Sequence, residues 1–307
     1  MKQWKRKDLL GLEALSKKEI ELILDNARSF KEISQREIKK VPVLRGKTIA
    51  FLFFEPSTRT RASFELAAKR LSADTILLSS SSSSILKGES FLDSVRNIEA
   101  MNIDLLIIRN SSAGFPCQIA PKLSVAVINA GDGCHEHPTQ ALLDLFTIRE
   151  KKGKIDGLRV SIIGDITHSR VARSNIYGLQ KLGAEITVCG PSTLIPVEIE
   201  KMDVRVVHNI DEAIKQADVL NILRIQKERH SADFLIPSLR EYRELFGISR
   251  QRLEKAKKNI LIMHSGPINR GIELDFDIAD THSVILEQVT NGVAVRMAVI
   301  YLLAGRK

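Results

Sequence analysis

Residues 48–61 read T-I-A-F-L-F-F-E-P-S-T-R-T-R, and this stretch decides the fold. Its run 48–54 is almost wholly apolar, which is typical of a strand buried on both faces in a parallel sheet. Pro56 lies just beyond the run and favours its end. Apolar residues then recur at the i, i+3, i+4, i+7 spacing of a helix with one buried face, namely Phe64, Ala67, Ala68 and Leu71. The stretch predicts a strand, a loop and a helix.

The same unit recurs along the chain. In the first half, further buried strands are expected at 75–78, 104–108 and 125–129, with helices near 91–101 and 116–122 and after Pro138. In the second half, strands are expected at 159–163, 185–189, 204–207, 219–222 and 260–263. Strands that alternate with helices predict parallel sheets with helices on both faces.

About nine strands exceed one comfortable sheet, so the pattern favours two doubly wound α/β domains with a ligand-binding cleft between them. The polar, glycine-containing segment 151–154 is the best boundary. The expected domains are therefore 1–150 and 151–287. The last helix, within 288–307, is apolar nearly all round and must be buried. It is expected to pack back onto the first domain, although its periodicity alone does not place it.

Composition narrows the class of protein. Among 307 residues, 44% are hydrophobic and 27% charged, which excludes a wholly disordered chain. The net charge of +9 suits anionic partners such as nucleic acid, a membrane surface or small acidic substrates. Three cysteines without a C-x-x-C spacing favour a reducing compartment. No signal peptide and no apolar run of about 18 residues is found, so a cytoplasmic protein is expected.

The loop 55–61 is the sharpest candidate site. The hydroxyls of Ser57, Thr58 and Thr60 lie with the guanidiniums of Arg59 and Arg61 at the start of the expected helix. A helix N-terminus favours phosphate, and arginine matches its oxygens. The alternative is that the hydroxyls cap the helix and the arginines are merely solvated. The loop is not a P-loop, because G-x-x-x-x-G-K-[ST] is missing.

Other strand ends in the first half carry similar residue types. Arg109 follows the strand 104–108, and His137 and Gln140 follow a glycine-rich turn after the next strand. The segment His135-Glu136-His137 does not favour a metal, because no third ligand stands at a defined spacing. The serine run 79–84, followed by Lys87 and Gly88, is typical of a flexible loop, with a mobile anion-binding segment as the alternative.

Strand ends in the second half complete the set. The loop 164–174 lacks G-x-G-x-x-G, so a dinucleotide site is only weakly supported. Arg224 and Gln226 follow the strand 219–222, and the segment 264–270 follows the last strand. Because ligands bind at the carboxyl ends of strands in open α/β sheets, the whole set indicates a cleft for a highly anionic small ligand.

These motifs resemble the aspartate/ornithine carbamoyltransferase family. The matching segments, in order, are F-x-E-P-S-T-R-T-R (53–61), S-x-x-x-K-G-E (83–89), H-P-T-Q (137–140), G-D-I-x-H-S-R-V-A-R-S (164–174), R-x-Q (224–226) and H-x-G-P (264–267). Glu55 is typical of the aspartate branch, whereas the ornithine branch usually has lysine there and a late H-C-L-P motif. Ser265 stands where the family usually has proline, and Gly266–Pro267 is a candidate for a cis bond.

The resemblance implies transfer of the carbamoyl group from carbamoyl phosphate to L-aspartate, giving N-carbamoyl-L-aspartate and phosphate, an early step of de novo pyrimidine biosynthesis. No metal or organic cofactor is required. An alternative is a carbamoyltransferase for another amine, such as ornithine. A basic nucleic-acid-binding protein is the other class, but only 5% of residues are aromatic and no nucleic-acid motif is present. Neither nucleic acid nor a membrane is an expected partner.

The resemblance also implies residue roles. Carbamoyl phosphate would be bound by Ser57, Thr58, Arg59, Thr60, Arg109, His137, Gln140, Ser265 and Gly266. Within that set, the catalytic residues would be Arg59, Thr60, Arg109 and His137. Aspartate would be bound by Lys87, Arg170, Arg224 and Gln226. Ser83 and Lys87 would come from the neighbouring subunit, which implies a homotrimer with shared sites. Whether such trimers join regulatory chains or a dihydroorotase stays open.

Overall fold

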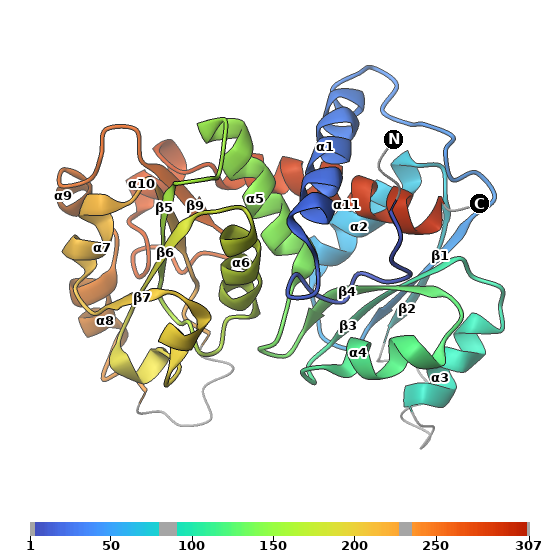
Figure 1. Cartoon of the computed structure of the whole chain (residues 1–307), viewed down its shortest axis with the longest axis horizontal. Coiled ribbons are helices and arrows are strands. Elements are labelled where there is room, and N and C mark those ends of the chain that lie inside the picture. Colours follow the sequence, from blue (N-terminus) through green and yellow to red (C-terminus); the bar gives the residue numbers. More distant parts are fainter. Residues whose placement is uncertain (1–3, 80–90, 227–234, 306–307) are drawn as a thin grey trace. The chain divides into compact units, whose positions relative to one another are not determined.

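A computed structural model describes residues 4–79, 91–226 and 235–305 of the chain (Figure 1). The chain divides into two compact units. Unit 1 comprises Met1–Leu143 together with Thr290–Lys307, and unit 2 comprises Asp144–Val289. The chain passes between the units within two helices, α5 (Pro138–Lys152) and α11 (Ile285–Ala304).

Unit 1 is built on a four-stranded parallel sheet with the order β2-β1-β3-β4. Its strands are β1 (Thr48–Phe53), β2 (Asp74–Ser79), β3 (Leu105–Asn110) and β4 (Ala126–Asp132). In Figure 1, α1 (Lys17–Ser34), α2 (Thr58–Arg70) and the end of α11 lie above this sheet, and α3 (Phe91–Glu99) and α4 (Phe115–Ile119) lie below it. Both faces of the sheet are therefore covered, which explains its apolar strands.

The segment before α1 adds to the sheet of unit 1. Leu9 donates its N–H to Val127 O and accepts a bond from Asn129 N–H, each at 2.9 Å, so it pairs with the outer edge of β4. Helix α1 then begins with a capping box, in which the Ser16 hydroxyl accepts from Glu19 N–H and the Glu19 carboxylate accepts from Ser16 N–H. The N-terminal segment thus protects an edge strand that would otherwise be open.

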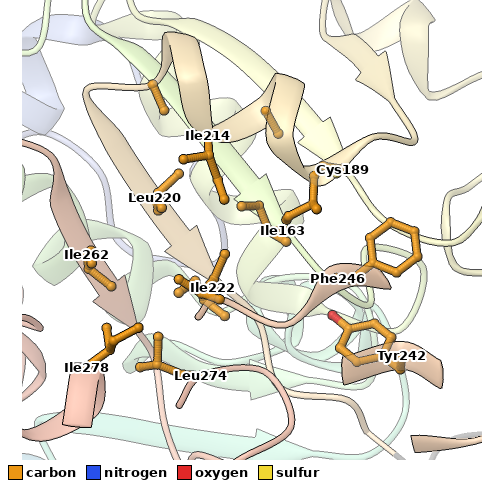
Figure 2. Packing of buried hydrophobic residues seen from close by; sticks show 14 of the residues in the cluster. Ile163, Cys189, Ile214, Leu220, Ile222, Tyr242, Phe246, Ile262, Leu274 and Ile278 are labelled. Atoms are coloured by element: carbon orange, nitrogen blue, oxygen red, sulfur yellow. The ribbon is translucent and has the colours of Figure 1, made fainter. Parts of the chain in front are cut away.

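Unit 2 has a five-stranded parallel sheet with the order β7-β6-β5-β8-β9. The strands are β5 (Arg159–Ile163), β6 (Glu185–Cys189), β7 (Arg205–Val207), β8 (Val219–Ile222) and β9 (Leu261–His264). Helix α6 (Arg170–Lys181) lies on one side in Figure 1, and α7 (Ile210–Gln216), α8 (Leu239–Phe246), α9 (Arg250–Leu253) and α10 (Phe276–Thr281) on the other. The core on this second side joins Ile163 and Ile222 of the sheet to Ile214 and Tyr242 (Figure 2).

Each sheet has one point where the winding direction reverses. In unit 1 the first strand, β1, lies between β2 and β3, and in unit 2 the first strand, β5, lies between β6 and β8. Ligands of open α/β sheets bind outside the carboxyl ends of the strands at such points. The loops after β1, β3, β5 and β8 are therefore the natural ligand-binding positions of this chain.

The predicted α/β class with parallel sheets is confirmed, and the strands expected at 159–163, 185–189 and 219–222 have the observed bounds. The strand expected at 104–108 lies slightly later in the chain, because it runs to Asn110 and includes Arg109. Helix α11 begins at Ile285 rather than near Gln288. The expected domain boundary at 151 and the expected cleft between the domains stay predictions. Among the described residues, no helix is both long and apolar enough to cross a bilayer.

Candidate active site

The loop after β1 presents an electropositive helix end. Ser57 is the N-cap of α2, has extended backbone dihedrals and makes no capping hydrogen bond with its side chain. The first turn of α2 contains no acidic residue, while Arg59 lies exposed within it. A cation at the positive end of a helix dipole is unfavourable for the helix itself. The arrangement is therefore suited to an external anion such as phosphate.

Arg109 is held at the same edge of unit 1. Residue Phe53 pairs with Arg109 in the register of β1 and β3, and Phe54 N–H donates to Arg109 O at 2.9 Å. The guanidinium is buried and donates to Glu55 Oε1 at 2.7 Å and to Ala130 O at 3.1 Å. Arg109 is thus fixed between the loop after β1 and the end of β4.

The turn after β4 is organised by Asp132, whose carboxylate is fully buried. It accepts from Asn129 Nδ2 at 2.8 Å, Glu136 N–H at 3.0 Å and Gly114 N–H at 2.7 Å, and it also contacts His135 Nδ1 at 3.0 Å. Because Gly133 N–H also donates to Asn110 O at 3.0 Å, the end of β3 is bound to the same turn. The turn that leads into α5 is therefore rigidly held.

His137 follows this turn and precedes the first residue of α5. Its side chain is buried, and Gln140 in the first turn of the helix is partly buried. Since the ends of β1, β3 and β4 are neighbours in the sheet, unit 1 brings the loop 55–60, Arg109, His137 and Gln140 to one edge.

The sequence does not predict a role for Glu136, which lies next to His137 and stands out only as part of the segment His135-Glu136-His137. Its carboxylate is almost fully buried and accepts from Leu12 N–H at 2.8 Å and from Glu13 N–H at 3.2 Å. Through these two hydrogen bonds, Glu136 attaches the N-terminal segment to the loop that carries His137.

Within the described ranges there is no cluster of three or more His, Cys, Asp or Glu side chains that could hold a metal ion.

In unit 2, the loops after β5 and β8 approach closely. Gly164 has φ +128°, and a Cβ at that position would lie 3.0 Å from Leu223 O. Leu223 N–H donates to Ile163 O at 2.8 Å. Only glycine fits this backbone without strain. Its presence lets the loop that leads to Arg170 lie directly beside the segment that carries Arg224.

The loop after β5 ends in a capped helix. His168 Nδ1 lies 2.8 Å from Asp165 Oδ1, which also accepts from His168 N–H at 3.1 Å. Ser169 caps α6 by accepting from Ala172 N–H at 3.1 Å. Arg170 is the first residue of α6 and is almost fully buried, so its guanidinium is confined by its surroundings.

The loop after β9 is fixed by His264. Its ring Nδ1 accepts a hydrogen bond from Gly266 N–H at 2.7 Å, and its backbone N–H donates to Gln288 Oε1 at 3.0 Å. The Gly266–Pro267 peptide bond is cis. Ser265 and Gly266 are half-buried, which leaves part of this loop accessible.

Three buried titratable groups of unit 2 have raised pKa values. Burial raises the pKa of the Cys189 thiol to about 12, with the charge of Glu212 adding to the effect and that of Arg252 opposing it. Burial likewise holds the pKa of Tyr242 well above its usual 10. Burial also raises the pKa of Glu273, although hydrogen bonds from Ile225 and Asn269 oppose the shift. Cys189 and Tyr242 are therefore unsuited to nucleophilic chemistry at neutral pH.

The sequence-predicted residues fall into two sets by unit. Unit 1 contains Ser57, Thr58, Arg59, Thr60, Arg109, His137 and Gln140, and unit 2 contains Arg170, Arg224, Gln226, Ser265 and Gly266. Ser83 and Lys87 lie outside the described residues. No local pattern indicates the roles of Glu136 and Glu273, because each carboxylate binds backbone N–H groups far along the chain.

The chain is similar to known proteins over nearly its whole length. Residues 7–150 match the family description "Aspartate/ornithine carbamoyltransferase, carbamoyl-P binding domain", and residues 156–303 match "Aspartate/ornithine carbamoyltransferase, Asp/Orn binding domain". The aspartate carbamoyltransferase catalytic subunit of Carboxydothermus hydrogenoformans is 62% identical over 303 residues, covering 98% of this chain and 97% of that protein. The corresponding subunit of Syntrophus aciditrophicus is 59% identical and covers 99% of each chain.

Solved structures agree with this likeness. The aspartate transcarbamoylase of Trypanosoma cruzi in complex with carbamoyl phosphate has a TM-score of 0.89 at 28% identity, with 97% of each chain covered. The catalytic subunit of M. jannaschii aspartate transcarbamoylase has a TM-score of 0.84 at 35% identity and covers 97% of this chain and 98% of that one. The chain belongs to the aspartate/ornithine carbamoyltransferase family.

Proposed function

We propose that this chain is an aspartate carbamoyltransferase catalytic subunit, which transfers the carbamoyl group of carbamoyl phosphate to the amine of L-aspartate. The observation that carries the proposal is the gathering of Arg109, His137 and the S-T-R-T-R loop at one edge of the unit 1 sheet. Relatives about 60% identical over the full length are named as this catalytic subunit, which supports the same reaction.

The loop after β1 would bind the phosphate group. Ser57, Thr58 and Thr60 offer hydroxyl donors, and Arg59 offers a guanidinium at the electropositive end of α2. Charge-assisted hydrogen bonds of this kind are about twice as strong as neutral ones. The phosphate would thus be fixed while the carbamoyl group stays free to react.

The carbonyl group would be polarised by donors of unit 1. Arg109 would lie between the phosphate and the carbonyl oxygen, Thr60 and His137 would donate to that oxygen, and Gln140 would bind the carbamoyl NH₂ with backbone oxygens of Ser265 and Gly266. Attack by the amine forms a tetrahedral oxyanion. Fixed donors placed where this charge develops lower the barrier, and a buried guanidinium needs little reorganisation.

Aspartate would be bound by Arg170, Arg224 and Gln226 of unit 2, with Lys87 from a neighbouring subunit. Two guanidiniums and an amide suit a dicarboxylate, whereas ornithine would require an acidic partner for its distal ammonium. Holding the amine against the carbonyl supplies much of the acceleration. The departing phosphate would accept the proton of the amine, so no side-chain base is needed.

The domain roles follow the family descriptions. The expected domain 1–150, with the helix within 288–307 packed back onto it, would bind carbamoyl phosphate, and the expected domain 151–287 would bind aspartate. The matches of residues 7–150 and 156–303 to the two family domains support this division. We further propose a homotrimer with sites completed by Ser83 and Lys87 of a neighbour, in the cytoplasm, where carbamoyl phosphate is consumed for pyrimidine biosynthesis.

The test is carbamoyl transfer from carbamoyl phosphate, run in parallel with L-aspartate and L-ornithine. Carbamoyl aspartate formed with aspartate alone is expected. Product with ornithine alone would keep the phosphate-binding roles and overturn those of Arg170, Arg224 and Gln226. Product with neither amine would overturn the proposed reaction for the isolated chain.

A further inference from the structure

The segment 224–226 carries two of the residues proposed to bind aspartate, yet it belongs to no strand or helix. Arg224 and Gln226 are half-buried, while Ile225 between them is fully buried. Binding groups must be held closely to their productive positions, and irregular segments hold them less well than strands do. Some contact outside the sheet must therefore fix this segment.

The carboxylate of Glu273 makes that contact. Ile225 N–H donates to Glu273 Oε1 at 2.9 Å. The same carboxylate accepts from Asn269 Nδ2 at 2.6 Å and from Asn269 N–H at 2.9 Å, and Asn269 Nδ2 also lies 3.4 Å from Ile225 O. The peptide groups on both sides of Ile225 are thus bound by one Glu–Asn pair.

Glu273 is itself well anchored. Its carbonyl accepts from Ile248 N–H at 3.0 Å, and Gly271 N–H donates to Leu274 O at 2.9 Å. Its side chain is only 1% exposed, so it does not face solvent. The Glu273 carboxylate therefore holds the segment 224–226 against the loop around Glu273, which is itself fixed by these backbone hydrogen bonds.

A buried carboxylate costs free energy unless its hydrogen bonds offset that cost. An apolar residue at this position would leave the buried Ile225 N–H without its acceptor, because the backbone donor stays in place when its partner is removed. What Glu273 provides and an apolar residue does not is an acceptor for Ile225 N–H. That acceptor connects the segment after β8 with Asn269, which lies in the loop that follows Ser265 and Gly266 after β9.

We propose that Glu273 is a positioning residue that sets the affinity for aspartate by fixing the backbone between Arg224 and Gln226. The proposal rests on the proposed function of this chain, because it concerns the substrate that those two residues bind. Glu273 acts through Ile225 and not by touching the substrate. Its loss should weaken aspartate binding far more than carbamoyl-phosphate binding.

The experiment compares two variants with a matched control. Glu273→Met keeps the length of the side chain and replaces both carboxylate oxygens by a thioether, a much weaker acceptor, whereas Glu273→Gln keeps one acceptor oxygen. Ser161→Ala is the control, because the Ser161 hydroxyl is buried in the same unit and donates to Ala213 O at 2.8 Å without contacting the segment 224–226. For each protein we measure Tm, kcat and the KM of both substrates. We also measure the inhibition constant of succinate, a dicarboxylate that lacks the amine of aspartate and therefore reports binding alone.

Glu273→Met is expected to raise the KM for aspartate and the inhibition constant of succinate by about tenfold or more, the equivalent of one hydrogen bond to a charged acceptor. The KM for carbamoyl phosphate should stay within about twofold, and Glu273→Gln should lie between wild type and Glu273→Met. Ser161→Ala should leave both KM values unchanged, whatever its Tm.

Two results would overturn the proposal separately from the proposed function. In an active wild type, an unchanged KM for aspartate in Glu273→Met, or an equal rise for both substrates, would show that Glu273 does not position the aspartate site. If Glu273→Met fails to fold, the same two KM values measured on Glu273→Gln decide the question. A wild type that transfers carbamoyl groups to neither aspartate nor ornithine would instead overturn the proposed function, and this inference with it.

Discussion

Arg109 Nη2 lies 2.7 Å from Glu55 Oε1, and this ion pair joins the end of β3 to the loop after β1. Both side chains are largely shielded from solvent, at 9% and 21% exposed. A partner removed from such a pair leaves a shielded charge without its counter-ion. Glu55 therefore controls the position of the guanidinium proposed to bind both the phosphate and the carbonyl oxygen.

Glu55→Gln should lower kcat/KM for carbamoyl phosphate by about tenfold or more, because the neutral amide holds Arg109 less strongly than a carboxylate does. Steady-state kinetics with saturating aspartate measure kcat/KM for carbamoyl phosphate. The Tm of the variant, measured alongside, separates local loosening from unfolding. A kcat/KM within about twofold of wild type would show that Arg109 keeps its position without Glu55.

Arg59→Ala should abolish activity and leave stability nearly unchanged. Arg59 is exposed at the first turn of α2, so its replacement removes little from the core. Lys69→Ala on the same helix is the control, because Lys69 forms an exposed i,i+4 pair with Glu65, and such pairs contribute little to stability. More than a few per cent of wild-type turnover in Arg59→Ala would contradict the phosphate-binding role.

Glu136→Ala should destabilise the protein by about 3 kcal/mol and reduce turnover. The change leaves the N–H groups of Leu12 and Glu13 without their buried acceptor. It also removes the contact that holds the loop carrying His137 against the N-terminal segment. Chemical denaturation and initial rates measure the two effects. A full-activity variant with lowered stability would limit Glu136 to a structural role.

Glu19 gives a pH-dependent contribution to stability. Burial works to raise its pKa, but hydrogen bonds from Arg6 and Ser16 and the charge of Arg6 outweigh it and lower the pKa from the usual 4.5 to about 2. Because the folded-state pKa is depressed, the stabilisation is present above pH 4.5 and is lost as pH falls toward 2. The Tm difference between wild type and Glu19→Gln should therefore shrink across this window. A constant difference would contradict the assignment.

The proposed homotrimer with sites shared between subunits predicts complementation between inactive variants. Lys87→Ala and His137→Ala should each be inactive as pure trimers. The two variants are then dissociated, mixed and reassociated. In a mixed trimer, a site can take His137 from a Lys87→Ala chain and Lys87 from a neighbouring His137→Ala chain. Such a site should regain partial activity. Fully inactive mixtures in which sedimentation shows mixed trimers would argue against sites shared between subunits.

The strands were predictable because their signal is local. Runs such as 159–163 and 219–222 are short and consist mostly of Val, Ile and Leu, which is typical of a parallel strand that is buried on both faces. The end of β3 was missed because Arg109 and Asn110 are polar although both are buried within the sheet. The loop residues at strand ends were identified as candidates because the topology rule places ligands there.

The supporting carboxylates were not predictable. Glu136 binds Leu12, 124 residues earlier, and Glu273 binds Ile225, 48 residues earlier. A side chain that accepts from a distant backbone N–H leaves no periodic pattern near either partner. Such contacts depend on how loops meet in three dimensions, so only the fold identifies them.

Unit 1 is discontinuous in sequence, since it takes its last helical stretch from residues after Thr290. Val295, Met297 and Val299 of that stretch are fully buried. A nascent chain on the ribosome cannot complete the core of unit 1 until these residues have emerged, whereas unit 2 is continuous and complete once residue 289 has done so. The second unit in the sequence is thus able to finish folding first, and the earlier one must wait with an unfilled apolar surface.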